Sequence, residues 1–315
     1  MRGLAALLNV RNDSEVAFEP EPNPESVDTS AYRLFHLDVF TDAALEGNPL
    51  AVFPDARGID DHTMQRLARE MNLSETVFVL PATRPGCDAK VRIFTPAAEL
   101  AFAGHPTIGT SFVLRTVGAV APDAASLVLE ENIGPVPVRF DAGTPPKAWL
   151  RTPPITFGRT FDRIACAAAL GLTGDDLYGE LPVETASAGS AFAYVALRDP
   201  AAVDRAVSDA RAIRDALGSD GPLEVFLFAP VESGVYARMF APEIGIVEDP
   251  ATGSAAGPLA AYLVRHGLVP GDDASFICEQ GVKMGRRSVL HVRIDAAGID
   301  VGGSAVILFE TELHL

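Results

Sequence analysis

The chain has 315 residues, of which 48% are hydrophobic and 21% are charged, a composition typical of a folded globular protein. A chain of this length exceeds what one simple core supports, so we expect two domains or two halves. Lys and Arg number 25 against 42 Asp and Glu, which gives a net charge of −17. A phosphate backbone would meet a repelling field over most of such a surface, so nucleic-acid binding is not expected.

Neither the cysteines nor the apolar runs indicate export or membrane insertion. Cys87, Cys166 and Cys278 lie far apart without a C-x-x-C spacing, so no disulfide framework is indicated and a reducing cytoplasm is expected. The start of the chain lacks the small-residue cleavage pattern of a signal peptide. All apolar runs stay well below the ~20 residues that a membrane helix needs, so no membrane association is expected.

The first residues differ in composition from the rest of the chain. The stretch DSEVAFEPEPNPESVDTS, which begins at Asp13, combines acidic side chains with prolines and offers little to bury. Such a segment cannot offset the entropy that ordering would cost. We therefore predict an acidic, Pro-rich and disordered tail over residues 1–31, and a folded region from Tyr32 onward.

The folded region is expected to open with two strands and a helix. The stretch YRLFHLDVF alternates, and a GNP turn leads into a second apolar run, which predicts an antiparallel strand pair. Asp60 or Asp61 then caps a helix whose apolar residues recur at helical spacing and which ends near Asn72. Glu75 stands at the entrance of the next strand, so its carboxylate is expected at a loop-to-strand junction.

Three sequence blocks recur in the same order in the two halves of the chain. The first half reads ETVFVLP from Glu75, RIFTP from Arg92 and GHPTIGTSF from Gly104, and the second reads EVFLFAP from Glu224, RMFAP from Arg238 and EDPATGSAA from Glu248. One such match arises easily by chance, but three in order indicate an internal duplication. A duplicated α/β unit usually forms two related domains, and ligands commonly bind in the cleft between them.

The third block of each half carries the pattern that suggests a binding site. HPTIGT at His105 and DPATGS at Asp249 are both interpreted as loops that lead into helices, in which Gly253 admits a ligand and Ser254 caps the helix or donates to an anion. Free N–H groups at a helix N-terminus attract carboxylates and phosphates. Two such loops facing one cleft would hold a small anionic metabolite, although well-capped helices explain either loop alone equally well.

The ionisable residues of these blocks favour proton-transfer chemistry. A helix cap does not need an ionisable residue at the same loop position in both copies, here His105 and Asp249, together with the carboxylate of Glu75. Burial in a cleft raises the pKa of a carboxyl toward neutrality, where it can take and return a proton. Glu99 competes with Glu75 for this role. Glu224 is the repeat mate of Glu75 and is given less weight, because a second copy can lose its role.

Other catalytic signatures do not occur in the sequence. It contains no G-x-G-x-x-G after a first strand, no Walker loop and no G-x-S-x-G elbow, so hydride transfer, phosphoryl transfer and serine hydrolysis lose support. The histidines outside the third block show no metal-ligand spacing, and no metal site is expected. These histidines are His36, His62, His266, His291 and His314.

Residues 32–315 resemble the PhzF family, the phenazine-biosynthesis isomerases and their relatives with a diaminopimelate-epimerase-like fold. The resemblance is carried, in order, by GNPLAVF, REMNLSETVFVL, RIFTPAAELAFAGHPTIGT, RMFAPEIGIVEDPATGSAAGPLA and EQGVKMGR. It implies an α+β fold of two pseudo-symmetric domains, each a curled, mostly antiparallel sheet around a central helix. The domains are expected at residues 32–148 and 149–299, with a strand at about 300–315 returning to the first. It also implies a homodimer, no cofactor and no metal.

The resemblance assigns roles by position. Glu75 matches the family's acid/base glutamate, His105 a supporting histidine, and Asp249 the aspartate that faces it from the other domain. The residues that match substrate contacts are Ser74, Gly104, Gly253 and Ser254. The implied function is a cofactor-independent isomerase that shifts a proton on a small, carboxylate-bearing cyclic substrate, similar to trans-2,3-dihydro-3-hydroxyanthranilate isomerase. The alternative is a non-catalytic protein that keeps this cleft to bind a small anion or to interact with a partner.

Overall fold

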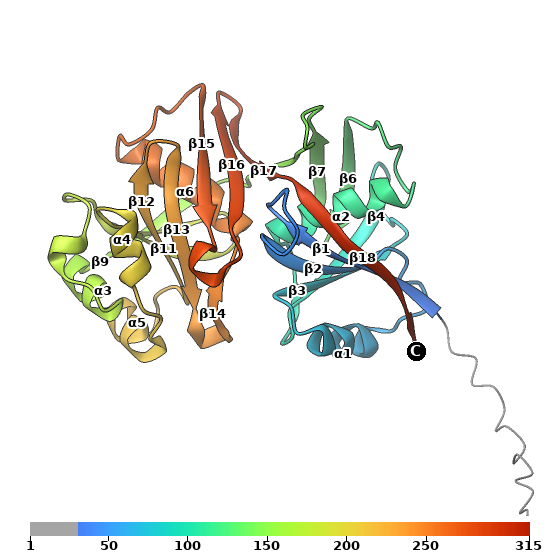
Figure 1. The fold of residues 1–315 in the computed structure, drawn as a ribbon, viewed down its shortest axis with the longest axis horizontal. Coiled ribbons are helices and arrows are strands. Elements are labelled where there is room, and N and C mark those ends of the chain that lie inside the picture. The colour runs from blue at the N-terminus through green and yellow to red at the C-terminus, as the bar shows by residue number, and fades with distance from the viewer. Residues whose placement is uncertain (1–30) are drawn as a thin grey trace, which may run out of the picture.

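Two lobes of strands and helices lie side by side in the computed structural model, which describes residues 31–315 (Figure 1). The predicted tail therefore lies outside the described residues, except for Ala31, which is the first residue of a strand. Among the described residues, no helix has both the length and the apolar character needed to cross a membrane.

The first lobe contains the helices α1 and α2 and the strands β1 to β8. They are β1 (Ala31–Val39), β2 (Asn48–Phe53), α1 (Asp61–Met71), β3 (Glu75–Leu80), β4 (Ala89–Phe94), β5 (Glu99–Leu100), α2 (Gly104–Thr116), β6 (Ser126–Glu131), β7 (Gly134–Phe140) and β8 (Ala148–Arg151). The predicted strand pair is confirmed, because β1 and β2 are antiparallel. The predicted helix is also confirmed: the side chain of Asp60 caps its start, and Asn72 ends it in the left-handed conformation.

The rest of the chain forms the second lobe and one strand of the first. These elements are β9 (Thr156–Phe161), α3 (Arg163–Ala169), η1 (Gly174–Asp176), β10 (Val183–Ser187), β11 (Ala191–Ala196), α4 (Pro200–Arg205), α5 (Ala210–Leu217), β12 (Glu224–Val231), β13 (Gly234–Ala241), η2 (Pro242–Ile244), β14 (Ile246–Asp249), α6 (Gly253–Arg265), β15 (Ala274–Gln280), η3 (Val282–Met284), β16 (Ser288–Asp295), β17 (Gly298–Gly303) and β18 (Ala305–His314).

The two lobes share one pattern of strand pairing. In the first lobe, β2–β3 and β4–β6 are parallel, and β1–β2, β3–β4, β4–β5, β6–β7 and β7–β8 are antiparallel. The second lobe repeats this series from β10 to β17, with β11–β12 and β13–β15 as its parallel pairs. The predicted fold class, a duplicated α+β unit with mostly antiparallel sheets, is confirmed.

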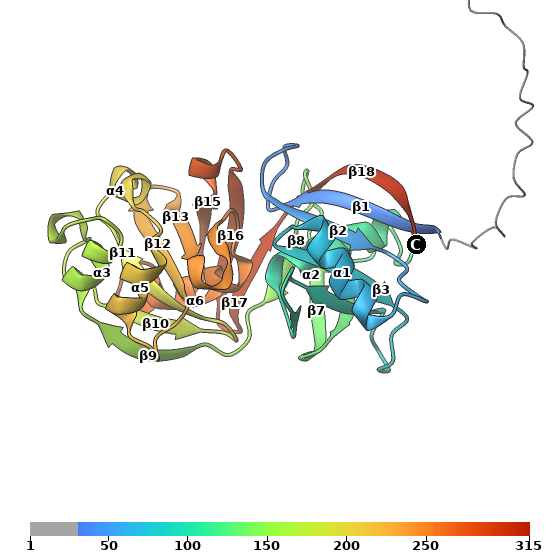
Figure 2. The ribbon, with the colours of Figure 1, turned by 90° about the horizontal axis from the view of Figure 1, so that it is seen from below.

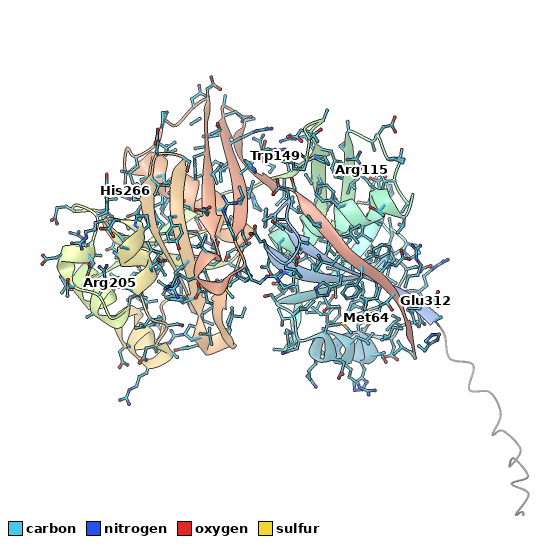
Figure 3. All side chains as sticks on the ribbon, viewed as in Figure 1. Met64, Arg115, Trp149, Arg205, His266 and Glu312 are labelled. Carbon is cyan, nitrogen blue, oxygen red and sulfur yellow. The ribbon has the colours of Figure 1, made fainter. Side chains whose placement is uncertain are left out.

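Each half of the chain also gives one strand to the other lobe. β9 follows β8 in sequence but pairs with β10 in the second lobe, and β18 follows β17 but pairs with β1 in the first. Figure 2 shows β18 crossing from β17 to lie along β1, and in Figure 3 Glu312 of β18 lies in the lobe that contains Met64 and Arg115. The boundary at residues 148 and 149 stays a prediction, because β8 pairs with β7 and with β17.

A central helix lies inside the sheet of each lobe. α2 and α6 are each 13 residues long and are mostly buried, and α2 packs against β1, β2 and β8. Small residues permit this close packing: a Cβ on Gly109 would lie only 2.6 Å from Cδ2 of Leu50. The sheet can therefore curl around the helix, and the predicted central helix of each unit is confirmed.

The starts of the two central helices correct one expectation about the repeat. α2 begins at Gly104 and α6 at Gly253, an offset of 149 that equals the offset between Glu75 and Glu224. His105 is therefore already helical and corresponds to Ser254, so the expectation that His105 and Asp249 occupy the same loop position is wrong. The two motifs have similar sequences but different positions relative to their helices, because Pro106 lies in the first turn of α2, whereas Pro250 lies before α6.

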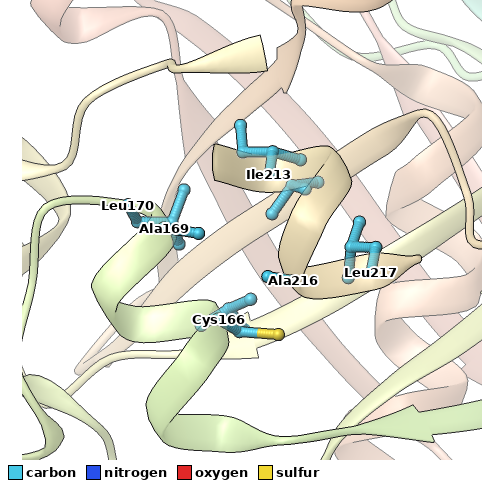
Figure 4. Close-up of a pocket in the computed structure, with 8 residues that line it drawn as sticks. Cys166, Ala169, Leu170, Ile213, Ala216 and Leu217 are labelled. Carbon is cyan, nitrogen blue, oxygen red and sulfur yellow. The ribbon is translucent and has the colours of Figure 1, made fainter. Parts of the chain in front are cut away.

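A small cavity in the second lobe lies between α3 and α5 (Figure 4). Its volume of about 10 Å³ leaves room for no more than about one water molecule. Its lining is Cys166, Ala169, Leu170, Val195, Ile213, Ala216, Leu217 and Val225. These side chains offer no group for polar recognition, and burial raises the pKa of the Cys166 thiol to about 11, which keeps it protonated.

Glu131, at the end of β6, is a buried acid that supports α2. Oγ1 of Thr107 lies 2.6 Å from a carboxyl oxygen of Glu131 and 2.7 Å from the carbonyl oxygen of Ala103. A hydroxyl has one proton to donate, so both contacts are satisfied when Glu131 itself carries a proton. Burial also raises the pKa of Glu131 from 4.5 to about 8.

We expect Glu131→Gln to stabilise the protein at alkaline pH. Because folding raises the pKa of Glu131, its contribution to stability is complete below about pH 4.5 and is lost as the pH rises through 8. The uncharged amide can donate to Thr107 at every pH, so the variant should gain on the order of 3 kcal/mol over the wild type between pH 5 and 9. Urea unfolding followed across that range checks this.

The adjacent Glu130 provides the control. Its carboxylate accepts hydrogen bonds from the backbone and hydroxyl of Thr83 and from the backbone of Arg84, which lower its pKa. Glu130→Gln should therefore destabilise the protein at neutral pH, the opposite sign. Equal pH dependence of the two variants would contradict the assignment of a neutral acid at position 131.

Candidate active site

A cavity of about 120 Å³ lies between the two lobes, and residues from both lobes line it. All seven residues singled out from the sequence are among its lining: Ser74, Glu75, Gly104, His105, Asp249, Gly253 and Ser254. The cavity borders a larger cleft of about 780 Å³, with which it shares Ser74, Thr95, Leu100, Ile244 and Ile246. The fold thus brings every predicted site residue to one place that a small molecule can reach.

The acidic residues of the cavity stand at the ends of strands. Glu75 is the first residue of β3, Glu224 is the first residue of β12, and Asp249 is the last residue of β14. His105 is the second residue of α2. Strand ends and first helical turns are held by the surrounding ladders and helices, so these side chains have well-defined positions.

The N-termini of the two central helices meet at the cavity. A Cβ on Gly104 would lie 3.2 Å from the carbonyl carbon of Gly253 and 3.3 Å from the backbone nitrogen of Ser254. Within residues 31–315 no side chain caps either helix at Ala103 or Thr252. The N–H groups of both first turns, with the positive ends of both helix dipoles, are therefore available to an anion.

We expect Gly104→Ala to impair this anion site more than it impairs folding. The added methyl group would push the two helix ends apart and cover the N–H of Ser254. Displacements of this size at a binding site can lower kcat/KM by about 100-fold. Gly158→Ala in β9 is a matched control, because its added Cβ would lie 3.3 Å from Cβ of Thr185 and Gly158 does not line the cavity. Steady-state kinetics and thermal melting of both variants check this, and equal activity losses would contradict it.

Asn48 connects the two lobes beneath the cavity. Its Nδ2 lies 3.0 Å from Oδ1 of Asp249, 3.0 Å from the carbonyl oxygen of Ala251, and 3.4 Å from Nδ1 of His105. Two acceptor oxygens fix the orientation of this amide, because the reversed amide would place oxygen against oxygen. Both protons of this nitrogen are directed to those oxygens and the nitrogen cannot accept a hydrogen bond, so a proton on Nδ1 of His105 would face another donor, and the proton of the neutral ring is assigned to Nε2.

The Nε2 side of the His105 ring lies near Glu75. Nε2 of His105 lies 3.3 Å from Oε2 of Glu75, and both side chains are largely buried, at 6% and 13% exposed. Burial lowers the pKa of His105 to about 3, so the ring is neutral at physiological pH. His105 is therefore a neutral ring beside the carboxyl group of Glu75, and neither its Nε2 nor Oε2 of Glu75 has a hydrogen-bond partner among the described residues.

A buried polar network holds Asp249 from the second lobe. The hydroxyl of Thr252 donates to Oδ2 of Asp249 at 2.6 Å, and the amide of Gln280 donates to the backbone carbonyl of Asp249 at 2.7 Å. Gln280 also donates to Oγ1 of Thr252 at 2.9 Å. Asn48 and Gln280 belong to the site although the sequence patterns did not predict it. Asn48 was assigned only to a turn, and the one signal for Gln280 was its place in the EQGVKMGR stretch.

Ion pairs separate the candidate acid/base residues from the other carboxylates near the cleft. Glu99 pairs with Arg92 at 2.8 Å, which lowers its pKa, and Glu248 pairs with Arg238 at 2.7 Å. Among the described residues, neither Lys nor Arg pairs with Glu75, Glu224 or Asp249. Glu99 is thus ion-paired and does not line the cavity, whereas Glu75 lines it without a cationic partner among the described residues.

Burial gives the three unpaired carboxyls raised pKa values. The pKa of Glu75 rises to about 8, mainly by desolvation, and the charges of Asp249 and Glu224 add to the effect. Desolvation and Asp249 raise the pKa of Glu224 to about 7. Desolvation raises the pKa of Asp249 to about 6, and hydrogen bonds from Thr252, Asn48 and Ser74 limit the rise. Several carboxyls in one cavity can therefore exchange protons near neutral pH.

Comparison with known proteins agrees with this site and fold. The family described as phenazine biosynthesis-like protein matches residues 37–311. The chain belongs to the PhzF family. A trans-2,3-dihydro-3-hydroxyanthranilate isomerase from Pseudomonas aeruginosa is 39% identical to this PhzF chain over 292 residues, which cover 90% of the chain and 100% of that protein.

Solved structures extend the comparison. A PhzF-family phenazine biosynthesis protein from Bacillus anthracis has a TM-score of 0.82 and 26% identity, covering 91% of this chain and 100% of that one. A hydroxyproline epimerase from Agrobacterium vitis, at 15% identity and a TM-score of 0.64, covers 90% of this chain and 93% of that one, and shares the fold alone. The present PhzF chain is an enzyme of the isomerase type.

The chemistry available to this PhzF chain is proton transfer. Its cavity combines carboxyls that change charge near neutrality, a neutral imidazole donor and two helix N-termini that can bind an anion. Among residues 31–315, no group of three or more His, Cys, Asp or Glu side chains is arranged to hold a metal ion.

Proposed function

We propose that this chain is a cofactor-independent isomerase that moves a proton on a small, carboxylate-bearing cyclic substrate, with Glu75 as the acid/base group. The observation that carries the proposal is the buried Glu75 carboxyl, without a cationic partner among the described residues, beside two helix N-termini in the interlobe cavity. The name of the Pseudomonas aeruginosa relative suggests trans-2,3-dihydro-3-hydroxyanthranilate, or an acid of similar shape, as the substrate.

In the proposed reaction, the substrate carboxylate binds to the first-turn N–H groups of α2 and α6. The ionised form of Glu75 takes a proton from a ring carbon, and the electron pair left behind spreads over the conjugated ring and its carboxylate. Glu75 then returns the proton to another ring carbon, so that no atom or electron is gained or lost overall. A general base of this kind contributes about 10² to 10⁴ in rate.

The neighbouring residues support Glu75. The neutral ring of His105 lies 3.3 Å from Oε2 of Glu75 and adds no charge, and its unpartnered Nε2–H is available to the carboxylate or to the substrate. Asp249 holds Asn48 and Thr252, and thereby positions His105 and the start of α6. The homodimer and the cytoplasmic location implied by the family resemblance stay predictions.

The test is to incubate the enzyme with trans-2,3-dihydro-3-hydroxyanthranilate in deuterated water and to follow both isomer formation and deuterium incorporation by NMR. Isomer formation at a catalytic rate supports the proposal. Tight binding of the acid in calorimetry, with no carbon-bound hydrogen moved, would overturn it in favour of a protein that only binds the anion.

A further inference from the structure

We propose that Arg286 is a positioning residue for the active site, which acts from the second lobe by holding the loop that carries Asn48. Arg286 does not line the interlobe cavity, and it acts on the reaction only through Asn48. The inference rests on the proposed function and adds a residue to it. It also gives the EQGVKMGR stretch a role beyond the contacts of Gln280.

The guanidinium of Arg286 binds three oxygens of the first lobe. Its Nε donates to the carbonyl oxygen of Gly47 at 2.9 Å. Its Nη2 lies 2.9 Å from the carbonyl oxygen of Glu46 and 2.5 Å from Oδ1 of the fully buried Asp38. A charged, planar fork of donors can satisfy this set of acceptors at once. Arg286 thus fixes the backbone of the two residues that precede Asn48.

The loop between β1 and β2 has a conformation that needs support from outside. Leu45 has a φ of 69°, in the left-handed region that is unfavourable for leucine. Its side chain is 69% exposed, so burial of that side chain does not hold the residue there. Instead its backbone N–H donates to Oδ2 of Asp38 at 2.7 Å, and the other oxygen of this carboxylate binds Arg286. Asp38 and Arg286 therefore hold a strained loop that leads directly into Asn48.

The turn that ends at Arg286 also supports the other partner of Asn48. At the start of this turn, Gln280 donates to the backbone carbonyl of Asp249. The backbone N–H of Arg286 donates to the carbonyl oxygen of Gly281 at 3.0 Å, which closes the turn. A Cβ on Gly281 would lie only 2.3 Å from the carbonyl oxygen of Arg286, so the turn is tightly packed. One compact segment of the second lobe therefore sets the position of Asn48 relative to Asp249.

The consequence for the reaction concerns the ring of His105. Both protons of the Asn48 amide are directed to oxygens of the second lobe, and its nitrogen lies 3.4 Å from Nδ1 of His105. A proton on Nδ1 would face this donor, so the ring carries its proton on Nε2, 3.3 Å from Oε2 of Glu75. When Arg286 no longer holds the loop, Asn48 moves and the Nδ1–H form of the ring becomes accessible. Nε2 then loses the proton that serves the carboxylate or the substrate.

The experiment compares Arg286→Lys, Asn48→Ala and the double variant with the wild type, with trans-2,3-dihydro-3-hydroxyanthranilate as the substrate. Lysine keeps a positive charge beside Asp38, but its single nitrogen cannot replace the fork that binds both carbonyls. We expect Arg286→Lys to lower kcat by about 10-fold through displacement of Asn48, with KM nearly unchanged because the helix N-termini remain. Since Arg286 acts through Asn48, the double variant should be no slower than Asn48→Ala alone.

A second measurement does not depend on turnover. Nitrogen NMR of the protein with isotope-labelled histidine reports which ring nitrogen of His105 carries the proton, and His105→Gln identifies its signals. We expect the Nε2–H form in the wild type and a mixture with the Nδ1–H form in Arg286→Lys. Thermal melting of each variant verifies that it is folded.

The matched control is Arg151→Lys. Arg151 also binds a mostly buried carboxylate through two nitrogens, with Nε at 2.6 Å and Nη2 at 3.1 Å from the oxygens of Asp300. Its side chain is 29% exposed, close to the 26% of Arg286, and it does not line the cavity. Arg151→Lys should therefore leave both kcat and the protonated nitrogen of His105 unchanged.

The outcomes separate the role of Arg286 from the proposed function. An unchanged His105 ring in Arg286→Lys overturns the positioning role, and so does a loss of kcat that multiplies with the loss in Asn48→Ala. Equal losses of kcat in Arg286→Lys and Arg151→Lys overturn it as well, because they indicate general destabilisation. If the wild type does not convert the substrate, the proposed function fails, whereas a shift of the His105 proton in Arg286→Lys still supports the positioning role.

Discussion

Replacing Glu75 by Gln is expected to lower kcat/KM by about 1,000-fold while leaving the enzyme folded. The amide has nearly the shape of the carboxyl but cannot accept the substrate proton. It would still face Nε2 of His105, which lies 3.3 Å from the carboxylate in the wild type. Steady-state kinetics with trans-2,3-dihydro-3-hydroxyanthranilate measure the loss.

The pH dependence of Glu75 supplies an independent check. Because burial raises its pKa from 4.5 to about 8, kcat/KM of the wild type should rise with pH and level off above 8, as Glu75 becomes the base. For the same reason Glu75 stabilises the fold only while protonated, and stability should fall between pH 4.5 and 8. Glu75→Gln removes this loss, so the variant should be less active and yet more stable at pH 8. A variant that loses both activity and stability would contradict the assigned role.

Asp249→Asn is also expected to cause a large loss, about 100-fold in kcat/KM. Both oxygens of Asp249 accept hydrogen bonds, from Asn48 and from Thr252. An Asn side chain has only one acceptor, so one of these donors would face an N–H group instead. An unsatisfied buried donor costs about 1–3 kcal/mol, and the displacement would reach His105 through Asn48.

The pH profile of Asp249→Asn distinguishes an effect of Asp249 on Glu75 from a general loss of structure. The charge of Asp249 raises the pKa of Glu75, so its removal should move the rise of kcat/KM to lower pH. Glu248→Gln removes a neighbouring carboxylate that pairs with Arg238 and does not line the cavity, and it should leave that midpoint in place. An unchanged pH profile for Asp249→Asn would show that Asp249 does not act on Glu75.

Local sequence patterns predicted the first elements of the chain well. The alternation before the GNP turn predicted β1 and β2, and the cap at Asp60 with its helical spacing predicted α1, because both signals depend on residues close together in sequence. Family resemblance supplied the two-lobed α+β fold. Residues 75, 105 and 249 were predicted for one site and they do line one cavity.

The features of the site that the sequence did not predict depend on contacts between residues far apart in the chain. The residue patterns alone did not rank Glu75 above Glu99, the family resemblance assigned the role to Glu75, and only the structure shows Arg92 paired with Glu99. Asn48 was assigned to a turn, and only the fold shows its amide bonded to Asp249, which lies 201 positions away. The match of His105 with Asp249 was wrong for a similar reason: the two motifs resemble each other in sequence, but His105 lies inside α2 and Asp249 lies before α6.

The crossing strands β9 and β18 have a consequence for how this protein can be made and altered. Since β18 pairs with β1 in the first lobe and β9 pairs with β10 in the second, a fragment ending at β9 would lack β18, and a fragment starting at β10 would lack β9. Each half of the chain therefore depends on the other for one strand of its lobe. We therefore expect neither half to form its complete lobe when it is produced alone.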